Sequence, residues 1–106
     1  MPLAPPMLHI LLALADTDLH GLGIADRVEE ATDGAVELGP GTLYRSLKEM
    51  ADEGLIREAT APEGADPRRR YYTITPAGKR RAAREAARLE RVVEVARERR
   101  LLPERA

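Results

Sequence analysis

Residues 41–56 of this chain read GTLYRSLKEMADEGLI, and this stretch decides the fold. Its apolar residues lie along one helical face, as in a helix that packs against a core: Leu43, Leu47, Met50 and Ala51. The preceding Gly-Pro-Gly indicates a turn, and Thr42 is placed to cap the helix that follows. Gly54 is typical of the residue that ends a helix. The stretch therefore predicts a turn, an amphipathic helix and a sharp stop.

Two more helices are predicted ahead of this stretch. Residues 7–15, MLHILLALA, are apolar on nearly every side but fall well short of the roughly 20 residues that cross a bilayer, so they predict a buried helix. Residues 21–32 predict a second helix, which ends at Asp33 and Gly34. Residues 36–38 predict a very short strand.

Two strands are predicted after the quoted stretch. They span residues 55–60 and 70–74, and the loop between them, residues 61–67, is rich in proline and carries a glycine. Side chains alternate between the faces of a strand, so Tyr72 is expected to face the core and Tyr71 to face outward. The pair predicts a hairpin with a long tip.

A long helix is predicted to follow, with Thr75 as its cap and Pro76 at its first position. It runs to about residue 100. Apolar residues follow alternating four-three spacing along it, the pattern of a coiled-coil seam: Ala82, Ala86, Leu89, Val93 and Ala96.

The order of predicted elements is helix, helix, turn, helix, hairpin and long helix. It predicts a mainly α fold with a small β-hairpin, of the winged helix-turn-helix kind. We expect residues 1–75 to form a winged helix-turn-helix DNA-binding domain and residues 76–106 to form a C-terminal dimerisation helix. In winged helix-turn-helix domains, the helix after the turn enters the DNA major groove.

The net charge of −1 conceals a strong asymmetry along the chain. Residues 1–66 hold 13 acidic and 4 basic side chains, whereas residues 67–100 hold 12 basic and 4 acidic ones. The basic half opens with three adjacent arginines at residues 68–70. This split favours a basic surface on one part of the fold. The alternative is a helix laced with local ion pairs, which leaves the three arginines unexplained.

Several classes of function are disfavoured by composition. The chain has no cysteine and only two histidines, so we expect no metal site and no cofactor. Its carboxylates are scattered over predicted helix surfaces and form no catalytic set, so we expect no enzyme activity. No signal peptide is recognisable and no stretch is long enough to span a membrane, so a cytoplasmic protein with no membrane partner is expected.

The candidate DNA contacts come from the helix after the turn and from the hairpin. Gly41 allows the backbone to approach a phosphate, and Thr42 can donate to one. Arg45 and Lys48 can reach guanine acceptors or phosphates, and their alternative role is to pair with nearby acids on the helix surface. Tyr44 either fills the core or donates to a phosphate. The hairpin adds Arg68, Arg69 and Arg70, which either contact double-stranded DNA or form a solvated tip.

The chain resembles the PadR family of bacterial transcriptional regulators. The resemblance lies in the Gly-Thr-Leu-Tyr helix start, the Glu-Gly-Leu-Ile end and the segment RYYTITPAG at residues 70–78, where Ile74 stands in place of the usual Leu. It extends back to His20 and Gly21, after which Leu22 and Gly23 replace the family's Tyr-x pair. It covers roughly residues 7–80.

This resemblance implies a homodimer that binds an inverted-repeat operator, usually as a repressor, and a small-molecule effector as a candidate partner. It also implies that the C-terminal helix dimerises, often against the partner's first helix. A head of some 60 residues is too small to bury both apolar surfaces, which independently favours association. The residues expected at the dimer contact are Leu8, Leu11, Leu12, Ala82, Ala86, Leu89, Val93 and Ala96. The chain has no Trp or Phe, so an effector pocket would be aliphatic.

The alternative reading is a winged-helix module that binds another protein and has no specific DNA target. The acidic first half of the chain favours this reading, because negative charge repels nucleic acid.

Overall fold

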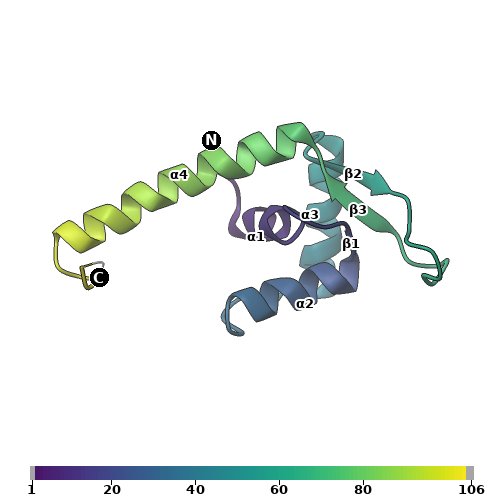
Figure 1. The fold of residues 1–106 in the computed structure, drawn as a ribbon, viewed down its shortest axis with the longest axis horizontal. Coiled ribbons are helices and arrows are strands. Elements are labelled where there is room, and N and C mark those ends of the chain that lie inside the picture. The colour runs from purple at the N-terminus through teal and green to yellow at the C-terminus, as the bar shows by residue number, and fades with distance from the viewer. Residues whose placement is uncertain (1, 105–106) are drawn as a thin grey trace.

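The computed structural model describes residues 2–104, and Figure 1 shows its arrangement. In chain order the elements are α1 (Pro5–Ala13), β1 (Leu19–His20), α2 (Gly21–Ala31), α3 (Pro40–Asp52), β2 (Ile56–Ala59), β3 (Tyr71–Ile74) and α4 (Pro76–Glu98). This arrangement confirms the predicted mainly α fold with a small antiparallel sheet. The loop between β2 and β3 and the free end of α4 lie at opposite ends of the long axis, along which the molecule extends 51 Å (Figure 1).

The sheet has three strands in the order β1-β3-β2, all antiparallel. The hairpin of β2 and β3 was predicted, but β1 was not. This strand has only two residues, and its pairing with β3 joins Leu19 to Tyr72 and His20 to Tyr71. The predicted strand at residues 36–38 is wrong, because no neighbouring strand offers a ladder there. Val36 instead donates its N–H to Thr32 Oγ1 at 3.1 Å.

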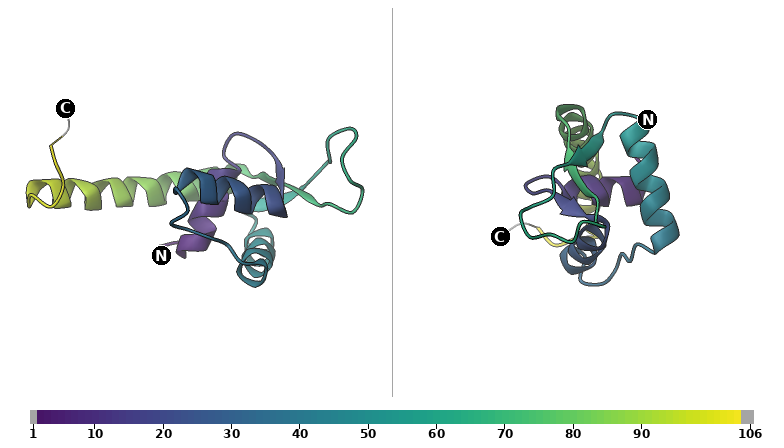
Figure 2. Two further views of the ribbon diagram at one scale, coloured as in Figure 1. Left: turned by 90° about the horizontal axis from the view of Figure 1, so that it is seen from below. Right: turned by 90° about the vertical axis from the view of Figure 1, so that its right-hand side faces the viewer.

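The core is centred on α1, which lies against α2, α3 and α4 (Figures 1 and 2). Ile10 and Leu11 of α1 expose none of their surface, and Ile24, Met50 and Ile56 close around them from other elements. This explains why α1 is apolar on nearly every side. Its residues face three partner elements at once, so a single apolar stripe would not suffice.

Local rules predicted one end of α3 correctly and the other wrongly. Gly54 has φ +76° and ends the helix as predicted: its N–H donates to Ala51 O, and the Leu55 N–H donates to Met50 O at 2.9 Å. The cap prediction for Thr42 is wrong. The helix begins at Pro40 with Gly39 as N-cap, and no side chain caps it. A proline at the first helical position lets the helix start three residues earlier than a threonine cap would.

Thr75 hydrogen-bonds both to the turn that ends α3 and to the first turn of α4. Its hydroxyl oxygen accepts from the Gly78 N–H at 3.0 Å, as predicted for the cap of the last helix, and its O–H donates to Gly54 O at 2.6 Å. A Cβ added at Gly78 would stand 2.1 Å from Leu55 O. The first turn of α4 therefore lies directly on the backbone at the start of the wing, and only glycine permits that approach.

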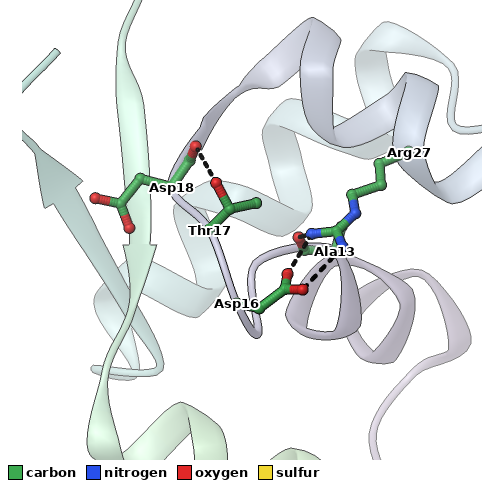
Figure 3. A network of polar contacts seen from close by, with 5 residues as sticks. All are labelled: Ala13, Asp16, Thr17, Asp18 and Arg27. Carbon is green, nitrogen blue, oxygen red and sulfur yellow. Dashed lines mark hydrogen bonds and ion pairs between the residues drawn. The ribbon is translucent and has the colours of Figure 1, made fainter. Parts of the chain in front are cut away.

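Figure 3 shows how α2 is tied to the end of α1. Arg27 Nη1 donates to Ala13 O at 2.7 Å and to Asp16 Oδ1 at 2.5 Å, and Nη2 donates to Asp16 Oδ2 at 3.2 Å. The Arg27 side-chain hydrogen bonds hold the pKa of Asp16 below its ordinary value. One guanidinium thus satisfies a carbonyl at the C-terminal end of a helix and fixes the loop that follows it.

The N-terminal segment is fastened to α4 by a buried carboxylate. Glu85 is only 5% exposed, and its Oε2 accepts the Leu3 N–H at 2.8 Å. Its other oxygen accepts from Arg88 Nε. Beyond Glu85, α4 leaves the head, and its residues 86–94 are all exposed (Figure 1).

No helix in the described chain is long and apolar enough to cross a membrane.

The residues predicted at the dimer contact differ in how exposed they are in the single chain. Leu8, Leu11 and Ala82 are buried against their own chain, so their surface is already taken. Sequence periodicity marks a residue as apolar and on one face, but it cannot tell which neighbour covers that face. Leu12, Ala86, Leu89 and Val93 remain exposed, and Ala96 is half-buried.

Candidate nucleic-acid interface

The outer face of α3 carries four of the predicted contact residues in exposed positions: Gly41, Tyr44, Arg45 and Lys48. Thr42 is half-buried beside them. Gly41, Arg45 and Lys48 follow four-three spacing and so share one side of the helix. The helix starts without a side-chain cap, so no side chain at the cap position takes up the backbone N–H groups of its first turn. This end of α3 is a surface that favours negative charge.

The cations on α3 differ in their partners. Lys48 Nζ lies 3.1 Å from Asp52 Oδ2, one turn along the helix, so the structure shows the local ion pair that was the alternative to DNA contact. Such an exposed pair contributes little stability and is readily exchanged for another anion. Among the described residues, no ion pair or hydrogen bond engages the Arg45 side chain, which leaves its guanidinium available.

A hollow of about 340 Å³ opens between the start of α2, Tyr44 of α3 and the wing. It is lined by His20, Gly21, Tyr44, Tyr72 and the three arginines at residues 68–70. Within the described part of the chain, no acidic side chain lines it. The structure thus brings Tyr44 together with all three wing arginines, and leaves Arg45 and Lys48 outside this hollow.

Tyr44 forms one wall of this hollow. Its side chain is 57% exposed, so it does not fill the core. It lies across the start of α2, where a Cβ added at Gly21 would come 2.9 Å from the Tyr44 hydroxyl. Tyr72 packs against the core as predicted, and burial raises its pKa above the ordinary value. The hydroxyl of Tyr44 is therefore the more accessible phenol of the two.

A second groove, about 610 Å³, lies on the other side of Tyr44 between α3 and the strands. Lys48, Arg57 and Arg70 line it together with Asp52 and Glu58, so its charge is mixed. The first hollow is the smaller of the two but carries cations without acids. An anionic ligand is therefore favoured in the first hollow.

The loop at the wing tip is ordered by its own aspartate. Asp66 Oδ1 accepts the Arg68 backbone N–H at 2.9 Å, and the Arg69 N–H donates to Asp66 O at 3.0 Å. The Arg68 guanidinium also pairs with this carboxylate, with Nη2 3.0 Å from Oδ2, and these bonds hold the pKa of Asp66 below its ordinary value. An Asp that bonds the backbone two residues on makes a tight turn.

His20 and Gly21 are not among the DNA contacts that the sequence predicts, although the family resemblance extends to both of them. His20 lies half-buried opposite Tyr71 across the β1–β3 pair, with ring centroids 5.3 Å apart, and Arg69 Nη1 lies 3.1 Å from His20 Nε2. Tyr71, predicted to face outward, is half-buried beside this ring. The one signal in the sequence was the His-Gly dipeptide, because the contact joins residues 49 positions apart.

Within residues 2–104, no group of three or more His, Asp or Glu side chains could hold a metal ion. The side chains of the hollow are cationic, aromatic or neutral, and they suit the binding of an anion.

The chain has three helices followed by a hairpin with a basic loop, and the third helix, which follows the turn, is exposed on its outer face. This arrangement is that of a winged helix-turn-helix regulator. The model of the transcriptional regulator PadR-like family matches residues 10–84. The chain belongs to this family.

Relatives agree with that assignment. The chain is 36% identical over 88 residues to the transcriptional regulator Rv3488 of Mycobacterium tuberculosis, a match that covers 76% of this chain and 78% of the relative. It is also 36% identical over 83 residues to an uncharacterised 37.1 kDa protein in transposon TN4556 of Streptomyces fradiae. That match covers 78% of this chain but only 22% of the Streptomyces protein, so the chain spans about a fifth of it.

Solved structures share the fold. A PadR family transcription regulator from Clostridium difficile R20291 matches with a TM-score of 0.75 and 27% identity, over 90% of this chain and 97% of that one. Bacillus subtilis PadR in complex with operator DNA matches with a TM-score of 0.66 and 27% identity, over 77% of this chain and 46% of that one. The chain is thus a PadR-like transcriptional regulator in sequence and in fold.

Proposed function

We propose that this regulator binds double-stranded DNA sequence-specifically and acts as a dimeric repressor at an inverted-repeat operator. The observation that carries the proposal is the hollow lined by residues 68–70 and Tyr44, which has no acidic side chain and adjoins the exposed face of α3. Operator DNA in the Bacillus subtilis PadR complex gives the same fold a DNA-bound precedent.

In this proposal α3 lies in the major groove and the wing lies against the backbone. Arg45 reads a base edge, because it is exposed and a guanidinium matches the two acceptors of guanine. Lys48 exchanges Asp52 for a phosphate. Gly41 and Thr42 present first-turn N–H groups to the backbone. Arg68, Arg69 and Arg70 then neutralise phosphates beside the groove, and Tyr44 donates its hydroxyl to one of them.

The proposed dimer contact uses the free end of α4 and the outer side of α1. Leu89, Val92 and Val93 are exposed on α4, and Leu12 is exposed on α1. Contact between water and such apolar side chains is unfavourable, so a partner surface that covers them is favoured. A two-fold pairing of these surfaces would bury them and would place two copies of α3 on successive turns of the duplex. An inverted repeat is the sequence symmetry that such a dimer matches.

A cytoplasmic location fits a DNA-binding role. An effector, if one acts, is an aliphatic compound held near the dimer contact, because the chain offers no Trp or Phe to stack against a flat ring.

A mobility-shift titration against DNA from upstream of the chain's own gene tests the function. We expect a discrete complex with one inverted repeat at a dissociation constant on the order of nanomolar, at physiological salt. Equal affinity for every duplex would reject specific binding, and no retention on DNA together with a monomeric chain would favour the protein-interaction module.

A further inference from the structure

The three wing arginines have different partners, and this difference singles out one of them. Arg68 is held by Asp66, and Arg70 Nε lies 4.0 Å from Glu58 Oε1. Arg69 makes no ion pair or side-chain hydrogen bond with a carboxylate among the described residues, although its charge also helps to hold the pKa of Asp66 low. Its Nη1 lies 3.1 Å from His20 Nε2. A carboxylate partner competes with a phosphate for the guanidinium, whereas an imidazole does not neutralise it. Within the described chain, the guanidinium of Arg69 is therefore not engaged by a carboxylate, unlike those of Arg68 and Arg70.

The contact fixes the proton of His20. A guanidinium only donates hydrogen bonds, so Nε2 must accept through its lone pair and the ring hydrogen must be on Nδ1. His20 acts here as a neutral imidazole. One of the five N–H groups of Arg69 is thereby engaged, and four remain.

The His20 ring is itself held in place from several sides. Its backbone pairs with Tyr71 in the sheet, and the two rings meet with centroids 5.3 Å apart. On α2, a Cβ added at Gly23 would come 3.2 Å from His20 Cε1, so the ring lies over that glycine. A ring fixed by strand pairing and packing can fix the long, flexible side chain that it contacts.

We propose that His20 is a positioning residue for DNA binding. It orients Arg69 so that the free edge of the guanidinium and the Tyr44 hydroxyl face one backbone phosphodiester in the hollow. A planar guanidinium offers paired donors to two oxygens of a phosphate, provided that its plane is held. This inference rests on the proposed function, and it assigns the central wing contact to Arg69 rather than to Arg68 or Arg70.

A double-mutant cycle measures whether His20 acts through Arg69. His20→Phe keeps a ring beside Tyr71 but removes the acceptor, and we expect it to weaken binding to the best duplex roughly tenfold. Arg69→Ala should weaken binding roughly 10- to 100-fold. The double variant should bind no more weakly than Arg69→Ala alone. If the two losses multiply, His20 contributes independently of Arg69, and the inference is overturned.

Two controls separate positioning from a structural effect. His20→Gln supplies a neutral acceptor at similar reach and should recover affinity to within about threefold of wild type. If it binds as weakly as His20→Phe, the acceptor has no role and the inference fails. In an Arg68→Ala background, His20→Phe should still cost its full tenfold factor. Thermal unfolding confirms that each variant is folded.

The outcomes distinguish this inference from the function on which it rests. A wild-type chain that discriminates no duplex from bulk DNA would overturn the proposed function, and the inference with it. Specific binding by wild type together with multiplying losses would overturn the inference alone.

Discussion

At the scale of single residues, the fold depends on a few positions where local chemistry meets a distant contact. Gly78 combines both. It follows the Thr75 cap in the first turn of α4, a place where many residues would suit a helix, yet its Cα faces the carbonyl oxygen of Leu55. The segment RYYTITPAG, which ends at Gly78, was visible in the sequence. The reason for glycine was not, because it lies in the approach of two backbones more than 20 residues apart.

Gly78→Ala tests this close approach. In an open helix position, Gly→Ala stabilises by up to about 1 kcal/mol. Here the new methyl group would meet backbone at 2.1 Å, so α4 must shift, and we expect the free energy of unfolding to fall by about 1–3 kcal/mol. Urea unfolding followed by circular dichroism measures the difference.

Gly41→Ala is the matched control for Gly78→Ala. Gly41 also lies in the first turn of a helix, and an added Cβ would meet nothing within 4 Å. The free energy of unfolding of Gly41→Ala should equal or exceed that of wild type. Equal effects of the two substitutions would show that the contact with Leu55 does not constrain α4.

At the scale of elements, local sequence rules succeeded where one element determines its own ends. Gly54 and Thr75 were predicted as a stop and a cap because their partners lie within a few residues. Thr42 was wrongly predicted as the cap of α3 because two signals for a helix start lie close together. The helix begins at the first of them, Pro40. Strand β1 was missed because two residues carry no periodicity, and its partner β3 lies some 50 residues along the chain. The hollow was missed in the same way, since its walls come from α2, α3 and the wing.

The attachment of the N-terminal segment to α4 should depend on pH. The Leu3 N–H bond, and then Arg88, hold the pKa of Glu85 below its ordinary value. A carboxylate whose pKa is lower in the folded state stabilises the fold above its unfolded pKa, about 4.3, and loses that contribution as pH falls through the folded value. Glu85→Gln should therefore lower the melting temperature at pH 7, and the difference from wild type should shrink as pH falls below about 4.

Thermal unfolding across that pH range checks this expectation, with Glu90→Gln as control. Glu90 is exposed on the same helix. A difference between Glu85→Gln and wild type that stays constant down to low pH would contradict the ionised attachment.

At the scale of the whole molecule, the wing arginines and the exposed apolar residues of α4 lie toward opposite ends of the long axis. The basic wing stands at one end, and the projecting part of α4 with Leu89, Val92 and Val93 stands at the other (Figure 1). The charge split between residues 1–66 and 67–100 predicted a basic surface, and the three arginines at residues 68–70 line the hollow. Most of the other basic residues of this half lie along α4, where Arg88 and Arg91 pair with acids of the same helix. Which apolar residues stay exposed could not be predicted, because that depends on where α4 leaves the head.

Val93→Glu tests the proposed dimer. A charge in a buried apolar seam is costly, so we expect the variant to be a monomer at concentrations where wild type is a dimer. Sedimentation velocity distinguishes the two states. Ala87→Glu adds the same charge on the opposite side of α4 and should leave the dimer intact. A wild-type chain that sediments as a monomer would reject the dimer, and a dimer unaffected by Val93→Glu would place its contact elsewhere.

The central claim is that this regulator reads DNA sequence with α3 and anchors itself with the wing. The most direct test is the ratio of affinities for the inverted repeat and a scrambled duplex, measured by mobility shift at physiological salt. We predict a ratio of at least about a thousand for wild type. Arg45→Ala should lower that ratio, whereas Arg69→Ala should weaken binding to both duplexes alike and reduce the salt slope by about one. A wild-type ratio near one would contradict the claim.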